Sequence, residues 1–558
     1  MVRNNVDPTY GDLYKEIEVF QWLESQQNPS TDQTRALITN LAPLGEEGLD
    51  IARAFLDKHG RAHQLDSLLE SCKKLPVANY QTFALLGFDG DLPKDYANPL
   101  EELKALKKAR AMKLRGLYYH SDRLCLNANT FAKYVLRRRT LVYVNGQGFF
   151  TYEPSGVWRP MERLELEKLC RDILHEAEDG IWKKSWSREY ISALELEAEL
   201  VEKMDKDLHF INLRNGMIDL RTMDLEPHHP SYYSTVQVPV KYNPDAKCPQ
   251  FKRFLESVFD GDQERINLVQ EIMGYVLTKE RRLQKAFIFY GVGANGKSVL
   301  AEVIRHIAGP DNVSNVPLAK LTDRFGLDNL PGKTVNISTE NELGDKYLNT
   351  QNFKAITGGD VVNVEQKYKD SFSCELFCKL LISVNQLPKT LDHSHGYYRR
   401  LVIVPFQKVF REEEQDPNLL DKLLTELEGI LVFALEGYQR LYRNDYRLSP
   451  CQASEKALAA YKAEQNPVLL FVQEELRFNP GSSARQSELY PAFQNWARRN
   501  GCSDYNPSRQ RFWHLFKAAC AELGLKFSQK KVNGIVHIEN FELLRGRQRD
   551  FEKLFDES

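Results

Sequence analysis

The feature that most constrains this chain is a short apolar run followed by a glycine-rich loop and a helical pattern. Residues Ala286 to Tyr290 are apolar or aromatic, which predicts a buried strand. The loop reads Gly291-Val-Gly-Ala-Asn-Gly-Lys-Ser298, and apolar residues then recur at helical spacing from Val299 to Ile307. A strand, a glycine loop and a helix in this order are the context that a phosphate-binding loop requires.

The chemistry of such a loop follows from its backbone. Glycines allow successive N–H groups to turn toward a phosphate, and the helix N-terminus adds its partial positive charge. We expect Lys297 to contact the β- and γ-phosphates of a nucleoside triphosphate and the Ser298 hydroxyl to hold Mg²⁺. The alternative is an ordinary glycine-rich turn, but both flanks fit the nucleotide reading. The predicted nucleotide-binding residues are Gly291, Val292, Gly293, Ala294, Asn295, Gly296, Lys297, Ser298 and Val299.

Composition excludes some classes of protein and leaves others open. With 558 residues, 42% hydrophobic and 27% charged, the chain is long enough for three or four globular domains. The formal net charge is −2, so nucleic-acid binding must come from local basic patches. We find no uninterrupted apolar run of about 18 residues and no apolar leader, and we expect a cytoplasmic protein without a membrane contact. The nine cysteines include no C-x₂-C pair, which favours reduced thiols over a metal site.

Turn signals and changes in periodicity predict four domains, at residues 1–115, 116–250, 251–445 and 446–558. The first domain shows helical apolar spacing and ends in a basic run from Lys104 to Arg115, which is either a solvated helix face or a DNA-contacting patch. The second reads as an α+β domain, with Asn-Gly turns at Asn145 and Asn215 between strand-like runs.

Two carboxylates follow a β-branched strand that begins at Thr334. Glu340 and Glu342 lie where a nucleotide hydrolase needs one acid for Mg²⁺ and another for the attacking water. We assign Glu340 to the metal and Glu342 to the water, and the reverse assignment stays open. An acidic loop without a catalytic role is the alternative. Asn385 ends the next apolar strand, where an amide can contact the γ-phosphate or the water.

An arginine pair, Arg399 and Arg400, precedes a further apolar strand, Leu401 to Pro405. A guanidinium group matches a phosphoryl transition state better than an ammonium group does. If chains assemble as a ring, one of these arginines can reach the γ-phosphate held by a neighbour. By itself the pair would more often be a surface salt-bridge partner.

Read in order, five segments resemble the superfamily three helicases, in the branch of phage and plasmid primase-helicases and of the poxvirus primase-helicase. The Thr-Gly-Gly-Asp360 sequence and the Asn385-x-x-Pro segment are more specific than the phosphate loop alone. Residues 215–220 and 242–249 resemble the domain that precedes the motor in this branch. The five segments are Gly291–Ser298, Ser338–Glu342, Lys354–Asp360, Ser383–Pro388 and Tyr398–Phe406.

The resemblance implies an AAA+ motor that binds ATP and Mg²⁺, forms a homohexameric ring and translocates on single-stranded DNA. It implies a DNA-gripping hairpin within residues 361–372, with Lys367, Tyr368 and Lys369 at its tip, where a plain β-hairpin is the alternative. It also implies the following catalytic set, in which the spacing to Phe406 favours the second arginine: Lys297, Glu340, Glu342, Asn385, and Arg399 or Arg400, with Ser298 and Glu340 as metal ligands.

Beyond Pro467 the sequence predicts three helices and then two short strands around Asn533-Gly534. Helices followed by a basic hairpin suggest a winged helix, which can bind duplex phosphates or a protein partner. The expected fold class is therefore a multidomain α/β protein with an AAA+ P-loop NTPase core, helical and α+β N-terminal domains and a C-terminal winged helix. Many relatives carry a primase module before the motor, whereas residues 1–115 read as helical, so we expect no primer synthesis.

The leading functional hypothesis is an ATP-dependent ring helicase that acts on single-stranded and forked DNA in replication of a phage, plasmid or mobile element. A separate primase or polymerase is the expected partner. The second hypothesis is a nucleotide-switched DNA-binding initiator or scaffold without processive unwinding. A third is an NTPase that acts in defence or on RNA with the same motor residues.

Overall fold

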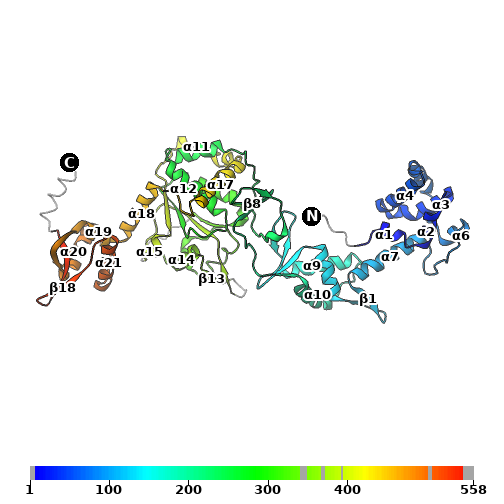
Figure 1. Ribbon diagram of the computed structural model, residues 1–558, viewed down its shortest axis with the longest axis horizontal. Coiled ribbons are helices and arrows are strands. Elements are labelled where there is room, and N and C mark those ends of the chain that lie inside the picture. The colour runs from blue at the N-terminus through cyan, green and yellow to red at the C-terminus, as the bar shows by residue number, and fades with distance from the viewer. Residues whose placement is uncertain are drawn as a thin grey trace. The chain divides into compact units, whose positions relative to one another are not determined.

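The fold is described from a computed structural model, which covers residues 7–339, 348–365, 371–390, 392, 394–500 and 505–544. The chain is a mixed α/β protein that divides into two compact units, residues 1–204 and 205–558 (Figure 1). Each unit is described by itself. Among the described residues, no helix is long and apolar enough to cross a membrane.

The first part of unit 1 is helical, as the sequence predicts. Buried residues of these helices form one apolar core, and Asn98 caps the longest helix with proline at its first position. The basic run on that helix is largely engaged, because three of its cations pair with Glu47, Glu178 and Glu16 and Arg115 is fully buried. The helices are α1 (Tyr10–Tyr14), α2 (Glu18–Ser25), α3 (Thr31–Leu41), α4 (Glu46–Lys58), α5 (Leu65–Cys72), α6 (Tyr80–Leu85) and α7 (Pro99–Leu114).

The second part of unit 1 is an α+β arrangement. The predicted hairpin around Asn145-Gly146 is confirmed, and its second strand pairs antiparallel with a third strand at Trp158. A fourth strand, β6, joins the sheet in parallel with β3, and the sequence analysis did not predict it. The elements are β1 (Leu117–His120), β2 (Arg123–Leu126), α8 (Ala128–Arg138), β3 (Leu141–Val144), β4 (Gly148–Tyr152), β5 (Trp158–Pro160), α9 (Arg163–His175), α10 (Lys184–Glu197) and β6 (Glu199–Val201).

Unit 2 opens with a small antiparallel sheet and two helices. Met217 and Ile218 of the predicted Asn-Gly hairpin are buried. These elements are β7 (Phe210–Leu213), β8 (Gly216–Asp219), β9 (Leu225–Glu226), α11 (Pro249–Val258) and α12 (Gln263–Val276).

A five-stranded parallel sheet forms the centre of unit 2. Its strand order is β11-β12-β15-β10-β16, so the strand before the glycine loop has a parallel neighbour on each side. The strands are buried along nearly their whole length, and β10, β15 and β16 are mostly apolar, as expected for a parallel sheet that is covered on both faces. The strands are β10 (Ala286–Tyr290), β11 (Val313–Ser314), β12 (Val335–Ser338), β15 (Lys379–Val384) and β16 (Leu401–Pro405).

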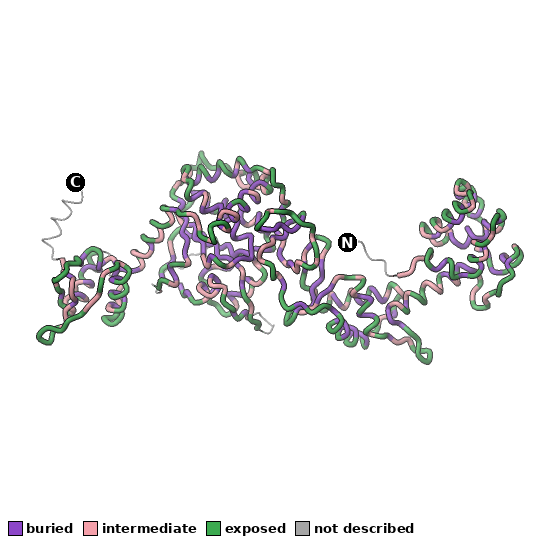
Figure 2. Tube along the Cα trace, in the orientation of Figure 1, coloured by how far each residue is buried: buried purple, intermediate pink, exposed green. Residues whose placement is uncertain are grey.

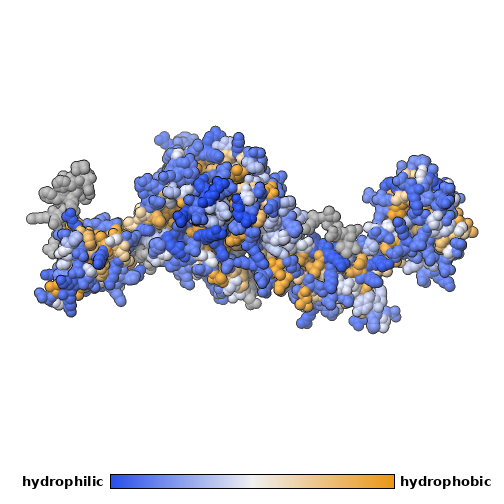
Figure 3. Space-filling model, in the orientation of Figure 1, coloured by the Kyte–Doolittle hydropathy of each residue, from blue (hydrophilic) through white to orange (hydrophobic). Residues whose placement is uncertain are grey.

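Alternate residues of β15, β10 and β16 supply two separate cores. Phe287 and Phe289 of β10 belong to the core that includes α12, α13 (Lys297–Ala308) and α17 (Leu427–Arg443). Ala286 and Ile288 belong to the core on the other face. Figure 2 shows this part of the trace as mostly buried, and the face visible in Figure 3 is largely hydrophilic around it. The burial on both faces fixes the register of the strands and therefore the position of the loop after β10.

The other elements of unit 2 follow the predicted order. The hairpin predicted within residues 361–372 has two strands, while Lys367, Tyr368 and Lys369 lie outside the described residues. Near the C-terminus, the three predicted helices are confirmed, and a strand that the sequence analysis missed joins a three-stranded sheet of order β17-β19-β18. The elements are α14 (Gln351–Gly358), β13 (Val361–Val364), β14 (Phe372–Glu375), α15 (His395–Tyr398), α16 (Leu419–Leu424), α18 (Gln452–Gln465), α19 (Pro467–Glu475), β17 (Leu476–Arg485), α20 (Gln486–Arg499), α21 (Arg509–Glu522), β18 (Gln529–Val532) and β19 (Ile535–Leu543).

Helices α12 and α17 cross closely because a glycine stands on each of them at the contact. A Cβ added at Gly274 would lie 2.2 Å from the carbonyl oxygen of Ala434, and one added at Gly437 would lie 2.2 Å from that of Gln270. The Gln270 side-chain amide also donates to the Phe433 carbonyl at 2.9 Å. The two backbones therefore touch without space for a methyl group between them.

This contact predicts that Gly437→Ala lowers the free energy of unfolding by about 2 kcal/mol, the usual cost of overpacking. Helix propensity acts in the opposite direction, because alanine is better than glycine inside a helix by about 1 kcal/mol. Denaturant unfolding of both proteins measures the difference. Arg443→Ala, on the exposed end of the same helix, is the control and should stay within about 0.5 kcal/mol. An alanine variant as stable as the parent would contradict the close crossing.

Candidate functional site

The glycine loop lies at the carboxyl end of the parallel sheet, between β10 and α13. Its first residue is held by the sheet, since the Gly291 N–H donates to the Val384 carbonyl of β15 at 3.2 Å. On the other side, the Phe406 N–H donates to the Tyr290 carbonyl at 2.7 Å. Ligands of open parallel sheets bind in the crevice at this edge. The predicted strand, loop and helix therefore meet where a ligand site is expected.

Two glycines of the loop occupy positions that no side chain fits. A Cβ at Gly291 would lie 2.2 Å from the Phe406 carbonyl oxygen, which is backbone and cannot move aside. Gly296 has φ +86°, and its Cβ would lie 2.7 Å from the Val258 side chain of α11. Gly293 has open space around it. The loop thus needs glycine at its two ends for packing and conformation, while its middle faces solvent.

The Lys297 side chain turns back into the loop. Its ammonium donates to the Val292 carbonyl at 3.0 Å, to the Asn295 Oδ1 at 3.1 Å and to the Gly291 carbonyl. Lys297 is 5% exposed, and burial lowers the pKa of its ammonium. Its contacts among the described residues are neutral oxygens, with no carboxylate in ion-pair range. A buried cation at a helix N-terminus without an anionic partner is suited to an anionic ligand such as a phosphate.

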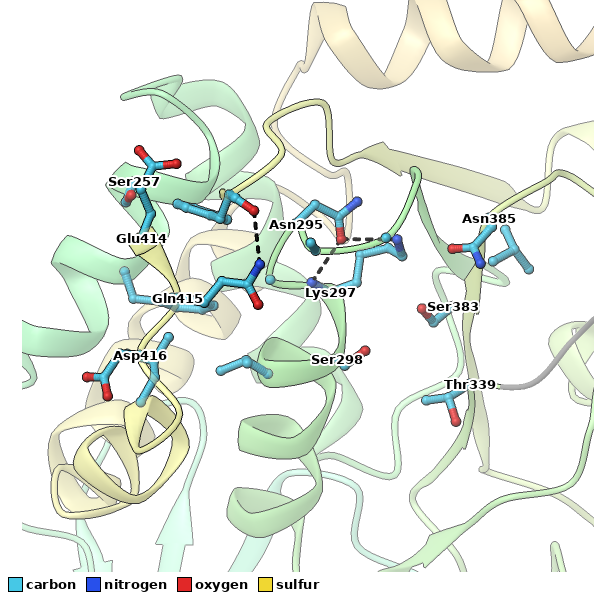
Figure 4. Close-up of a pocket in the computed structure, with 18 of the residues that line it drawn as sticks. Ser257, Asn295, Lys297, Ser298, Thr339, Ser383, Asn385, Glu414, Gln415 and Asp416 are labelled. Carbon is cyan, nitrogen blue, oxygen red and sulfur yellow. Dashed lines mark hydrogen bonds between the residues drawn. The ribbon is translucent and has the colours of Figure 1, made fainter. Parts of the chain in front are cut away.

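A cavity of about 1520 Å³ opens over the loop. Figure 4 shows Ser383 and Asn385 of the β15 edge on one side of the loop and Glu414, Gln415 and Asp416 on the other. Residues 293–299 of the predicted loop line it together with Asn385, whereas Gly291 and Val292 do not. Ser298 is exposed there, in the first turn of α13.

Several lining residues were not found from the sequence. They come from α11, as Gln250, Arg253 and Ser257, and from the segment after β16. That segment is tied to the loop, because the Phe410 N–H donates to the Ala294 carbonyl at 2.8 Å. The Gln415 amide donates in turn to the Phe410 carbonyl at 3.0 Å. No motif marks these residues, because tertiary contacts alone bring them to the cavity.

The predicted acidic pair lies outside the described residues. Thr339 is the last described residue of the segment that leads to Glu340 and Glu342, and it lines the cavity. The strand β12 therefore delivers the chain to the cavity immediately before the two carboxylates. Their roles stay predictions.

Arg399 and Arg400 lie at the amino ends of the parallel strands, whereas the glycine loop lies at their carboxyl ends. Neither arginine lines the cavity. Both residues precede β16, whose first residue pairs with Ala286, the first residue of β10. Arg399 is exposed and its Nη1 donates to Gln284 at 2.9 Å. Arg400 is half-buried, donates to the Gly396 carbonyl, and has a buried Nε without a hydrogen-bond partner among the described residues. Burial and the neighbouring Arg399 charge lower the pKa of Arg400.

The Gly358-Gly359 turn lies between two guanidinium groups. A Cβ added at Gly358 would lie 3.5 Å from Arg400 Nη2. Gly359 has φ +74°, and a Cβ added there would lie 3.2 Å from Cδ of Arg281. Arg281 donates to the Gly359 carbonyl at 3.2 Å and to Glu375 of β14 at 3.1 Å. The turn that precedes β13 is therefore connected both to Arg400 and to the base of the β13–β14 hairpin.

A buried lysine begins the strand β15. Lys379 is 5% exposed, and its ammonium donates to the Thr278 carbonyl and lies 5.1 Å above the Tyr275 ring. Burial lowers the pKa of Lys379 to about 7. The residue thus pairs with a carbonyl and a ring face rather than with a carboxylate at close range.

Comparisons with known protein families cover the middle of the chain. The family described as "D5 N terminal like" matches residues 128–260. A second, described as a family of unknown function (DUF5906), matches residues 289–400, which contain the loop, Asn385 and the arginine pair.

Curated relatives match parts of the same region. "Putative helicase L207/L206" of Acanthamoeba polyphaga mimivirus is 22% identical over 286 residues, which are 45% of this chain and 29% of that protein. "Putative helicase 022R" of Frog virus 3 (isolate Goorha) is 25% identical over 268 residues, 43% of this chain and 27% of that protein. The chain spans less than a third of the length of these relatives.

A phage protein also matches. The "DNA Primase-polymerase" of Nitratiruptor phage NrS-1 is 22% identical over 180 residues, 31% of this chain and 24% of that protein. The apo structure of the NrS-1 C terminal region aligns with 72% of this chain and 95% of that chain, at 13% identity and a TM-score of 0.42. Parts of the chain are thus similar to a D5 N-terminal-like family, to viral proteins named as helicases and to a phage primase-polymerase.

The environment of Lys379 predicts a dependence of stability on pH. Its pKa of about 7 in the fold lies below the value of 10.5 for a free lysine, so between these values the unfolded chain binds more protons. The free energy of unfolding should therefore rise with pH in this window, by up to about 1 kcal/mol per pH unit. In Lys379→Met this contribution is lost. Denaturant unfolding of both proteins from about pH 7 to pH 9 should give a difference, parent minus variant, that grows with pH. Parallel curves would contradict the assignment.

Proposed function

We propose that this chain is the motor of an ATP-dependent DNA helicase of the superfamily three, AAA+ type, with a P-loop NTPase core. It would act in the replication of a phage, plasmid or mobile element. The observation that carries the proposal is the buried Lys297 ammonium, which contacts neutral oxygens at a cavity also lined by Ser298, Ser383 and Asn385. The viral relatives named as helicases and the match to a D5 family support the same class.

The residues of the cavity suit the triphosphate of a nucleotide. Lys297 and the backbone N–H groups at the start of α13 would bind phosphate oxygens, with the ammonium exchanging its carbonyl partners for them. Asn385 would orient the attacking water or contact the γ-phosphate. Ser298 and Glu340 would hold Mg²⁺, which neutralises charge on the phosphates, and Glu342 would accept a proton from the water. The rest of the cavity has room for a nucleoside between α11 and residues 410–422.

The proposed assembly is a homohexameric ring. The loop lies at the carboxyl ends of the parallel strands and the arginine pair at their amino ends. A single chain therefore does not bring both to one phosphate. A neighbouring chain would supply Arg400, whose guanidinium group donates to the Gly396 carbonyl within a single chain. Lys367, Tyr368 and Lys369 would grip single-stranded DNA in the central pore, and the C-terminal helices and β-sheet would form a winged helix that binds DNA or a partner primase or polymerase.

The proposal predicts that Lys297→Ala and Arg400→Ala each reduce DNA-stimulated ATP hydrolysis by about 10³-fold or more, because each removes a contact to the transferred phosphoryl group. Arg399→Ala is the matched control, since this exposed neighbour is bonded to Gln284. Phosphate release by each purified variant measures the effect. Equal losses in the Arg399 and Arg400 variants would remove the distinction between the two arginines.

Mixing the two inactive variants tests whether Arg400 acts on a neighbouring chain. In a random ring of equal parts, about a quarter of the interfaces combine an intact Lys297 site with an intact Arg400, so activity should return to about that fraction. Recovery upon mixing requires catalysis between chains. A mixture as inactive as its components would contradict an active site shared between neighbouring chains.

Unwinding of a forked duplex separates the helicase from the initiator or scaffold alternative. The parent protein should unwind the fork with ATP, whereas Lys367→Ala should keep its basal ATP hydrolysis and lose unwinding. The gel or fluorescence assay of strand separation is run beside the hydrolysis assay. Hydrolysis with no unwinding by the parent protein would favour the nucleotide-switched initiator.

A further inference from the structure

A short β-hairpin in unit 1 presents aromatic side chains to solvent. β1 (Leu117–His120) and β2 (Arg123–Leu126) pair with each other and with no other described strand. Tyr118 is 51% exposed and Tyr119 is 64% exposed, more than any other described aromatic side chain. Neither ring makes a hydrogen bond or a ring contact with a described residue. In Figure 1 the hairpin projects from the surrounding helices, and Figure 2 shows its tip as exposed.

The exposed rings do not hold the hairpin in place. Leu117 and Leu126 stand opposite each other in the register and are buried in the core of this part, with Leu124 packed against it. The next positions, Tyr118 opposite Cys125 and His120 opposite Arg123, therefore face away from that core. Tyr119 is opposite Leu124 and on the same face as Leu117, nearer the tip, where its side chain is exposed. The leucines therefore anchor the hairpin, and the two tyrosines are on its opposite faces.

Cations lie on the hairpin and beside it. Arg123 is exposed and makes no ion pair with a described carboxylate. Lys183 donates to the Leu124 carbonyl at 3.1 Å, which brings the start of α10 beside the hairpin, and Lys184 follows it. Asp122, in the turn, is the carboxylate of the hairpin itself. Arg123 is thus part of the hairpin that carries the two exposed tyrosines, and Lys183 and Lys184 are at the adjoining start of α10. The net charge of the whole chain is −2.

We infer that the β1–β2 hairpin is a second nucleic-acid site, which binds single strands by stacking bases on Tyr118 and Tyr119 and pairing phosphates with Arg123, Lys183 and Lys184. Aromatic side chains beside cations are the combination that unpaired bases and their backbone require. A duplex offers no free base face to the rings, so single strands fit better than double strands. The site lies outside the motor and goes beyond the proposed function, because it needs neither ATP nor hydrolysis.

The test measures binding of a fluorescein-labelled oligothymidylate to the full chain by anisotropy, without nucleotide. Tyr118→Ala/Tyr119→Ala should weaken binding by about tenfold or more, since each stacked base contributes on the order of 1–3 kcal/mol. Tyr118→Phe/Tyr119→Phe should bind within about twofold of the parent, because stacking needs the ring and not the hydroxyl. Arg123→Ala should lower the salt dependence of binding by about 0.7 in the log–log slope. Leu196→Ala, which changes an 87% exposed side chain of the same unit, is the control.

The outcomes are separable. An alanine double variant that binds like the parent overturns the inference, and so does an equal loss on a duplex of the same length, which would mean phosphate contacts alone. A change in oligomeric state with unchanged DNA affinity would assign the hairpin to a contact between chains and also overturns it. An oligouridylate probe separates DNA from RNA, and preference for either fits the site. ATP hydrolysis without DNA should be unchanged in the alanine double variant. If the parent protein does not hydrolyse ATP but binds the oligonucleotide through these tyrosines, the helicase proposal is contradicted and the hairpin proposal is not.

Discussion

The ammonium group of Lys297 is the constraint on which the candidate site depends. It is buried at the start of α13 and surrounded by carbonyl and amide oxygens of its own loop. Holding a charge in that position is costly without an anionic partner, and the lowered pKa of the group reflects this cost. The loop keeps its shape because the sheet and Phe406 fix its ends and because glycine occupies the two positions where a side chain would collide. Packing therefore maintains a geometry that electrostatics alone would not favour.

The same sheet separates the two halves of the proposed chemistry. The loop and Asn385 lie at the carboxyl ends of its strands, whereas Arg399 and Arg400 lie at the amino ends. Two cores, one on each face, hold β15, β10 and β16 in register. The distance between the groups is therefore a property of a rigid element and not of a mobile loop, which is the physical reason for placing Arg400 in a site shared between chains.

Sequence patterns within a few residues predicted the helices, strands and turns whose conformation depends on those same residues. The β10 strand, the loop and α13 were predictable because apolar runs, glycines and helical spacing occur together, and the Asn-Gly turns marked the hairpins of β3–β4 and β7–β8. The strand β6 was missed, since its three residues are too short to show alternation, and β17 was missed because its sequence contains Asn479, Pro480 and Gly481. The walls of the cavity at Arg253 and Gln415 carry no motif, because only the tertiary fold brings them beside the loop. The roles of Glu340 and Glu342 and of the Lys367–Lys369 segment remain predictions from resemblance.

The strand order also constrains how this protein is made. β10 is translated first among its neighbours, yet its partners β15 and β16 follow only at residues 379–384 and 401–405. Until the ribosome has passed Val384, the apolar strand β10 has both of its hydrogen-bonding edges open, and one edge stays open until Pro405 has been added. Such edges recruit other chains. Pairing in this sheet is consequently completed late, when its edge strand β16 emerges.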